Sequence, residues 1–116
     1  MSDFKKFPNE HAEQVALVRK FRNNGHFIFH VPNGGKRSMT EAIRMKAEGV
    51  VAGIPDLCLV MPEGKMIWIE LKRRKGGTVS KVQKEVHARL EALGHVVIVG
   101  YGAKDAVDKL GGHLDD

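Results

Sequence analysis

The stretch GIPDLCLVMPEGKMIWIELKRRKGG, Gly53–Gly77, decides the fold because it reads as two strands joined by a tight turn. Residues 57–61 and 65–72 are rich in apolar and β-branched side chains, which is typical of strands. The turn between them, residues 62–64, contains proline and glycine, the residues that most often reverse a chain. We therefore predict an antiparallel hairpin here.

Three of the charged residues of this hairpin, Asp56, Glu70 and Lys72, lie at the same end of it. Side chains alternate between the two faces of a strand, so Glu70 and Lys72 point the same way, about 7 Å apart. Asp56 follows Pro55 directly at the start of the first strand, and antiparallel pairing across a short turn returns it to the Glu70 end. Two carboxylates and an amine are thus predicted to converge at one end of the hairpin.

The rest of the chain supplies helices and further strands around this hairpin. The first three predicted helices start with a good capping residue, and two of them carry a capping box, Ser38 with Glu41 and Ser80 with Gln83. The predicted elements are helices at 9–22, 38–49, 78–94 and 103–110 and strands at 26–31 and 95–100, in addition to the hairpin.

The resulting order, α-β-α-β-β-α-β-α, predicts an α/β protein with one mixed sheet flanked by helices. A length of 116 residues fits one domain covering 1–116, with a core at about 9–110 and a polar tail at 111–116.

The charge of the chain suits a polyanionic partner. Lysine and arginine number 19 against 14 aspartate and glutamate, a formal net charge of +5. The basic residues concentrate at Lys72–Lys75, at Lys36 and Arg37, and at Arg19–Arg22. On charge alone, a nucleic-acid partner and a set of solvated surface lysines are equally good interpretations. No apolar run approaches the length of a membrane span.

The single cysteine, Cys58, excludes an intrachain disulfide and favours a reducing compartment such as the cytoplasm. The N-terminal segment lacks an apolar stretch typical of a signal peptide, so we expect none. The absence of a C-x-x-C pair argues against a structural zinc site.

The converging charges of the hairpin favour a metal site. Two neighbouring carboxylates repel, and one of them must take up a proton unless a cation lies between them. Mg²⁺ prefers oxygen ligands, so Asp56, Glu70 and the main-chain oxygen of Leu71 would suit it, with Lys72 beside the ion. The alternative is a cross-strand salt bridge between Lys72 and one of the carboxylates.

The first predicted helix carries a further candidate ligand. On a helical wheel Glu10 and Gln14 project onto the apolar side with Leu17 and Phe21, together with Val15 and Val18, whereas Glu13 and Lys20 point away. A carboxylate on a buried face needs a partner or a metal. The alternative is a solvated acid in the first turn, stabilised by the helix dipole.

At these residues the sequence resembles the PD-(D/E)XK nuclease superfamily, through Pro55-Asp56 followed by Glu70-Leu71-Lys72. The surrounding motifs are similar to those of the VRR-NUC family, the virus-type replication-repair nucleases, and occur in the same order. These motifs are HVPNGGKRS at His30–Ser38, GVVAGIPDL at Gly49–Leu57, IELK at Ile69–Lys72 and SKVQ at Ser80–Gln83. The resemblance runs from Glu10 to about Val99 and implies a restriction-endonuclease-like core.

The resemblance also implies roles for individual residues, with Mg²⁺ or Mn²⁺ as cofactor. The implied metal ligands are Asp56, Glu70, the main-chain oxygen of Leu71, and Glu10 of the first helix. Lys72 would be the catalytic lysine and Gln83 a supporting residue that also caps its own helix. Glu13 is a weaker candidate than Glu10.

Residues predicted to contact DNA lie in two loops. In PNGGKR the glycines allow close backbone approach, and Asn33, Lys36 and Arg37 supply polar and charged groups. A flexible solvated turn is an equally good interpretation of this loop. The second loop follows the hairpin and carries Arg73, Arg74 and Lys75. His30 and His87 are assigned structural roles, because a lone histidine more often has one.

The sequence therefore predicts a metal-dependent DNA endonuclease that acts as a homodimer. The family resemblance and the small size favour a Holliday-junction-resolving enzyme, in which two sites related by a two-fold axis cut a four-way junction. A flap or nicking endonuclease is the alternative within the class, and a non-catalytic DNA-binding module the alternative outside it. A phage-encoded member would act in the host cytoplasm.

Overall fold

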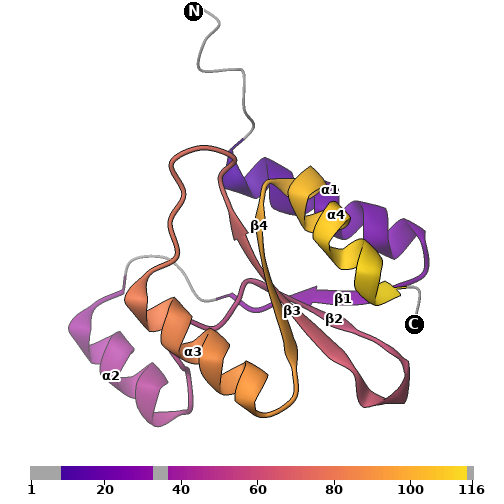
Figure 1. Ribbon diagram of the computed structural model, residues 1–116. Helices are drawn as coiled ribbons and strands as arrows, with labels where there is room; N and C mark the ends of the chain where they lie inside the picture. Colours follow the sequence, from indigo (N-terminus) through magenta and orange to yellow (C-terminus); the bar gives the residue numbers. More distant parts are fainter. Residues whose placement is uncertain (1–8, 33–36, 115–116) are drawn as a thin grey trace, which may run out of the picture.

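The computed structural model describes residues 9–32 and 37–114, and it has the predicted element order (Figure 1). Asn33 and Lys36, two of the predicted DNA contacts, lie outside the described residues. No helix in the described ranges has the length and apolar character needed to span a bilayer. The elements are α1 (Glu10–Asn23), β1 (Phe27–His30), α2 (Met39–Ala47), β2 (Leu57–Val60), η2 (Pro62–Gly64), β3 (Met66–Lys72), α3 (Lys81–Ala92), β4 (Val96–Tyr101) and α4 (Ala103–Leu114).

The four strands form one mixed sheet in the order β1-β2-β3-β4, which confirms the predicted α/β class. β1 pairs with β2 and β2 with β3 in antiparallel fashion, whereas β3 and β4 are parallel. In the hairpin Leu57 lies opposite Ile69 and Val60 opposite Met66. The turn is a short 3-10 segment in which Glu63 has a φ of 65°, the left-handed conformation that tight turns require.

The core lies between one face of the sheet and the helices α1 and α4, which lie side by side over that face (Figure 1). α3 covers the opposite face and carries the buried residues Val86 and His87. The largest core side chains come from α1, from the inward positions of the strands, and from α4; they include Leu17, Phe21, Ile28, Leu57, Leu59, Ile67, Ile69, Leu71 and Leu110.

The buried face of α1 differs from the prediction. Glu13 is only 3% exposed and lies on the same side as Leu17 and Phe21, whereas Val15 is 39% exposed. The prediction was wrong because a helical wheel finds the most apolar face, and here α4 packs beside α1 and covers the flank that carries Glu13. The asparagine cap was predicted correctly, since the Asn9 side chain accepts a hydrogen bond from the N–H of Ala12.

The last helix continues to Leu114, so residues 111–114 are helical rather than part of a polar tail. Leu114 packs against the core, and Lys65 Nζ donates to the main-chain oxygen of His113 at 3.1 Å. These tertiary contacts stabilise the final turn despite two successive glycines, which on local propensity alone would end the helix.

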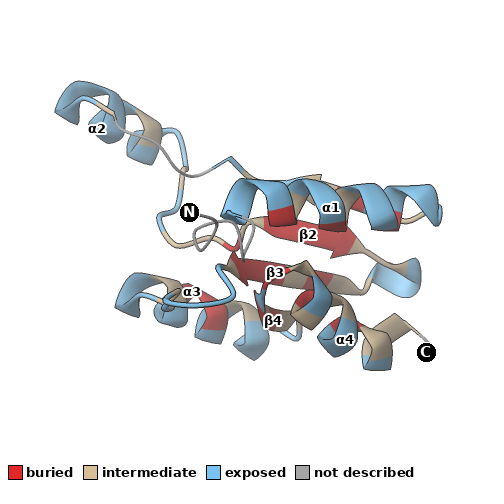
Figure 2. Cartoon of the chain, turned by 90° about the horizontal axis from the view of Figure 1, so that it is seen from above, coloured by how far each residue is buried: buried red, intermediate tan, exposed pale blue. Residues whose placement is uncertain are grey.

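α2 stands apart from the rest of the molecule (Figure 2). The predicted capping box is present, because the Ser38 hydroxyl accepts from the Glu41 N–H and the Glu41 carboxylate accepts from the Ser38 N–H. None of the nine residues of the helix is buried. Ile43 is 64% exposed, so the apolar side of α2 faces solvent.

Candidate active site

The register of the hairpin brings Asp56 to the end of β3. Because Leu57 lies opposite Ile69, Asp56 falls beside Glu70 and Leu71. The Leu71 N–H donates to Asp56 Oδ2 at 2.8 Å, so one carboxylate oxygen is held by the neighbouring strand. The main-chain oxygen of Asp56 accepts from the His30 ring at Nδ1, also at 2.8 Å, and from the N–H of Val31. Three strands therefore fix the position of Asp56.

Glu70 is 1% exposed, and each of its carboxylate oxygens has a partner on α3. Gln83 Nε2 donates to Oε2 at 3.1 Å, and His87 Nε2 lies 3.0 Å from Oε1. Lys72 Nζ is farther away, 3.9 Å from Oε2. The salt bridge of Lys72 with a carboxylate, which was the alternative to a metal site, is therefore present with Glu70 only as a long contact.

Gln83 connects the two functional side chains of β3. Its amide nitrogen donates to Glu70, while its amide oxygen accepts from Lys72 Nζ at 3.0 Å and from the Ser80 N–H at 2.9 Å. The Ser80 hydroxyl accepts from the Gln83 N–H in return, which completes the capping box. Gln83 thus caps α3 and supports the candidate site at the same time.

The surroundings of Glu70 strongly perturb its carboxyl group. Burial, the nearby charge of Asp56 and its hydrogen bond to that residue raise the pKa of Glu70 to about 8, against a weaker opposing effect of Lys72. At neutral pH Glu70 therefore keeps a proton. Burial and the Lys72 charge lower the pKa of His87 against the opposing effect of acids including Glu91, so its ring is neutral at neutral pH.

A polar cavity of about 390 Å³ opens beside Asp56. Side chains from α1 line it opposite the hairpin, notably Glu10 and Gln14, whose i, i+4 spacing places both on one side of the helix. Glu10 is exposed and contributes to the raised pKa of Glu70. The full lining is Glu10, His11, Gln14, His30, Ile54, Asp56 and Gln83.

Glu13, the weaker candidate for the metal site, has other partners. Its carboxylate accepts from Arg74 Nε at 2.7 Å and from the N–H of Ala103, the first residue of α4, at 3.2 Å. Arg74 and Ala103 hold the pKa of Glu13 below its ordinary value even though burial opposes this. We call Glu13, Arg74 and Ala103 the α1–α4 clamp, because these contacts join α1, α4 and the loop after β3.

Gly102 shows how tightly the α1–α4 clamp is packed. Its φ is +91°, and a Cβ there would lie 2.7 Å from Arg74 Cγ and 2.8 Å from Glu13 Oε2. We expect Gly102→Ala to lower the melting temperature clearly more than Gly25→Ala, which has a φ of +84° but open space around its Cα. The difference between the two variants, measured by thermal denaturation, isolates the steric clash from backbone strain. Equal melting temperatures would mean that Glu13 and Arg74 can move aside for the added methyl group without loss of stability.

The basic residues predicted to contact DNA are distributed unevenly. Arg73 and Lys75 are exposed in the loop after β3, next to the candidate site. Arg74 is in the same loop, but its guanidinium pairs with Glu13. Arg37 lies beside α2, in a hollow lined by Met45 and Val51 rather than in the cavity at Asp56.

The donor set at the end of the hairpin fits a hard divalent cation. Within residues 9–32 and 37–114 no three His, Cys, Asp or Glu side chains form a ready set of metal ligands. Mg²⁺, however, commonly uses only one or two carboxylates and completes its shell with water and substrate phosphate. The raised pKa of Glu70 fits this, since a cation can take the place of the proton that the carboxylate pair now retains.

Two features of the site were not predicted from the sequence. His87, assigned a structural role, contacts Glu70 directly, and its i, i+4 spacing from Gln83 on α3 was the available signal. The pair of Glu13 and Arg74 spans 61 residues and has no local signal.

The sheet and its flanking helices define an α/β protein with one mixed four-stranded sheet, which carries a carboxylate pair at the end of the hairpin. Residues 8–104 match the VRR-NUC domain, and the chain belongs to that family. Two solved structures share the fold. A VRR_NUC domain protein has a TM-score of 0.77 at 21% identity, and the match covers 93% of this chain and 89% of that chain. Another VRR_NUC domain has a TM-score of 0.63 at 24% identity, and the match covers 90% of this chain and 95% of that chain.

A curated phage protein is also similar in sequence. Over 47 residues the chain is 47% identical to "Putative nuclease p44" of Acyrthosiphon pisum secondary endosymbiont phage 1. The match covers 40% of this chain and 50% of the phage protein, so it spans half of that relative's length.

Proposed function

We propose that the protein is a metal-dependent DNA endonuclease that hydrolyses phosphodiester bonds. The observation that carries the proposal is the pairing of buried Glu70 with Asp56, which raises the pKa of Glu70 to about 8 beside Lys72. Such a pair is costly in a purely structural role, because burial beside a second carboxyl group forces Glu70 to keep a proton at neutral pH. Membership of the VRR-NUC family and the similarity to a phage protein named as a nuclease support the proposal.

Asp56, Glu70 and the main-chain oxygen of Leu71 would hold Mg²⁺ or Mn²⁺, with Glu10 facing them across the cavity. When bound, the ion would polarise the phosphoryl group and lower the pKa of a water molecule. The Leu71 N–H holds Asp56, while Gln83 and His87 hold the two oxygens of Glu70. This fixed arrangement limits the reorganisation needed when substrate binds.

Lys72 is the residue we assign to the reacting phosphate. Its ammonium group is held by Gln83 Oε1 and its side chain is 15% exposed, so the group is anchored while the side chain stays partly accessible. There it would orient the attacking water or neutralise the charge that develops on the phosphoryl oxygens. Arg73 and Lys75 would contact neighbouring phosphates from the loop after β3.

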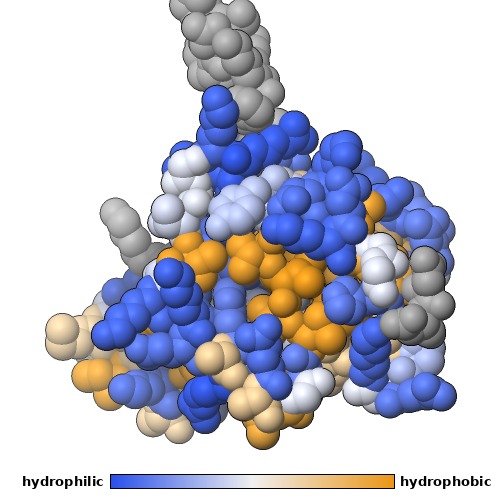
Figure 3. Space-filling view, in the orientation of Figure 1, coloured by the Kyte–Doolittle hydropathy of each residue, from blue (hydrophilic) through white to orange (hydrophobic). Residues whose placement is uncertain are grey.

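We further propose that the substrate is branched DNA, with a four-way junction preferred. The protein would act as a homodimer in the cytoplasm. If it is encoded by a phage, this is the cytoplasm of the host cell. Two copies related by a two-fold axis would place two sites on symmetric strands. Exposed apolar side chains on α2 and on α3, which form separate patches among hydrophilic ones in Figure 3, support a second copy as the occupant. Ile43 of α2 is 64% exposed and Leu93 at the end of α3 is 77% exposed. A nine-residue helix with no buried residue is marginal in water, so a partner surface would stabilise α2.

The dimer is tested on the apolar side of α2. We expect Ile43→Glu to convert the dimer to a monomer at micromolar concentration, because a carboxylate would be buried in the interface. Glu48→Gln, which also changes one charge but at an exposed position about 140° around the helix from Ile43, should leave the dimer intact. Light scattering coupled to size exclusion measures both. A wild-type protein that stays monomeric even with junction DNA bound would contradict paired cleavage.

The activity is tested by incubating the protein with labelled four-way junction, flap, nicked and linear DNA in Mg²⁺, Mn²⁺ or EDTA. We expect cleavage with either metal, none in EDTA, and the fastest cleavage on the junction. Faster cleavage of a flap, or of one strand of a duplex, would identify a flap or nicking enzyme instead. Binding without cleavage under every condition would leave a DNA-binding module and refute the nuclease.

A further inference from the structure

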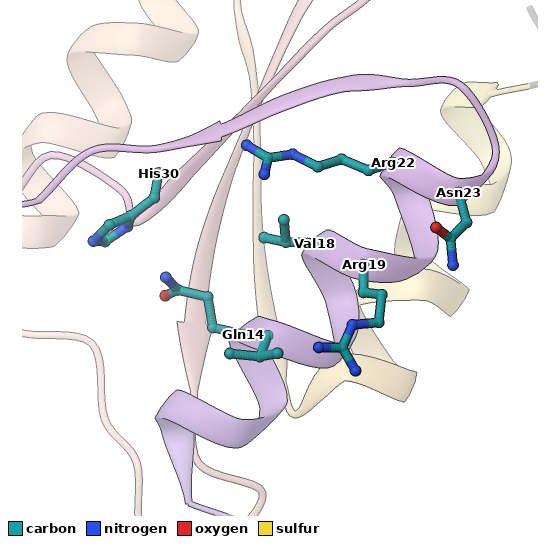
Figure 4. A pocket seen from close by; sticks show the side chains of 7 residues that line it. Gln14, Val18, Arg19, Arg22, Asn23 and His30 are labelled. Atoms are coloured by element: carbon teal, nitrogen blue, oxygen red, sulfur yellow. The ribbon is translucent and has the colours of Figure 1, made fainter.

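A second groove runs along α1 beside the candidate active site (Figure 4). It has a volume of about 460 Å³, and α1 forms most of its wall, with β1 contributing at one end. Two valines supply an apolar floor, and the remaining side chains are polar or basic. The lining residues are Gln14, Val15, Val18, Arg19, Arg22, Asn23 and His30.

The groove is continuous with the cavity at Asp56. Gln14 and His30 line both hollows, so a ligand seated at Asp56 can extend directly into the groove. In Figure 4 Gln14 and His30 lie at one end, and Arg19, Arg22 and Asn23 lie farther along α1. His30 is fixed at the junction of the two hollows by its hydrogen bond to the main-chain oxygen of Asp56.

The charge of the groove is entirely positive. None of its lining residues is acidic, and Arg19 forms no ion pair with any residue of the described part of the chain. Arg22 Nη2 donates to the main-chain oxygen of Ile28 at 3.1 Å, which anchors its guanidinium against β1. A guanidinium has five N–H donors, so an anchored arginine keeps donors for a ligand and loses less entropy when it binds one.

We propose that this groove binds the sugar–phosphate backbone of the DNA strand that is cut, next to the scissile phosphate. The inference rests on the proposed nuclease function and extends it by naming the path of the strand. Arg19 and Arg22 would contact successive phosphates, and Val15 and Val18 would contact the sugars. The proposal also gives a role to the basic cluster at Arg19–Arg22, which is far from the hairpin motif in the sequence. These residues would contact the phosphates of the DNA strand.

The decisive comparison is Arg19→Gln against Lys20→Gln. Both variants remove one positive charge from exposed positions of α1, but Lys20 does not line the groove. DNA affinity is measured in EDTA, where no cleavage occurs, over a range of salt concentrations. Losing one phosphate contact lowers the slope of log affinity against log salt by about 0.9, and weakens binding roughly fivefold at 0.15 M salt. We expect this for Arg19→Gln and a clearly smaller change for Lys20→Gln.

Steady-state cleavage gives a second readout. Arg19→Gln should raise KM and leave kcat within about twofold, because the lost contact binds substrate and transition state alike. If both variants lose affinity equally and with the same salt slope, the charge acts only at long range, and the proposal that the groove binds the DNA strand is refuted. Cleavage by the wild-type protein would still support the proposed nuclease function. If wild-type protein neither binds nor cuts any DNA, the proposed function itself fails.

Discussion

Glu70→Gln is expected to lower DNA cleavage by about a thousandfold or more while DNA affinity stays within about twofold of the wild type. The substitution keeps the shape of the side chain and removes the negative charge that a divalent cation requires. The amide oxygen can still accept from Gln83, and the amide nitrogen can donate to the neutral ring of His87. Fold and DNA surface should therefore survive, and the loss should lie in kcat.

Glu85→Gln is the matched control, because Glu85 is an exposed acid on the same helix as Gln83 and His87. Its cleavage rate should stay within about twofold of the wild type. Single-turnover cleavage of labelled DNA, with affinity measured in EDTA, separates chemistry from binding. If Glu70→Gln cut DNA normally, Glu70 would not be a metal ligand and the site assignment would be wrong.

The second large effect concerns stability against pH in the absence of metal. The pKa of Glu70 lies at about 8 in the folded protein and at its ordinary value of 4.5 when the chain is unfolded. Between these values the folded state holds a proton that the unfolded state has released, so the free energy of unfolding falls as pH rises through the window. The total loss is on the order of a few kcal/mol. Glu70→Gln binds no proton there and escapes the loss.

Thermal melts of both proteins from pH 4.5 to pH 9 in EDTA measure this linkage. The melting temperature of Glu70→Gln, relative to the wild type, should rise across that range and level off above about pH 8. Adding Mg²⁺ at pH 8 should raise the melting temperature of the wild type but not that of the variant, because the cation replaces the proton only where a carboxylate is present. A difference that does not change with pH would contradict the raised pKa.

The hairpin and its charged end were predictable because local rules govern them. Strand alternation put Glu70 and Lys72 on one face, and the length of the turn fixed the register that returns Asp56 to them. The capping boxes at Ser38 and Ser80 follow from side-chain spacing within a single turn. The convergence of these residues is therefore a property of the sequence itself.

The features that the sequence did not reveal depend on contacts between distant segments. Glu13 is buried because Arg74, 61 residues away, reaches it from the loop after β3. His87 reaches Glu70 because α3 packs across the sheet at one particular rotation about its axis. Neither packing angle nor helix rotation is encoded in a local pattern, so a wheel drawn for α1 alone placed Glu13 on the wrong side.

The position of Gln83 has a mechanical consequence. One amide closes the first turn of α3 and also holds the carboxylate and the ammonium of β3. Fraying of that turn, a motion that helix ends undergo readily, would release both reactive groups at once. Order in the candidate catalytic groups is thereby coupled to order in a helix terminus. Anything that stabilises the start of α3, including a bound DNA strand, would therefore order Glu70 and Lys72 together rather than one at a time.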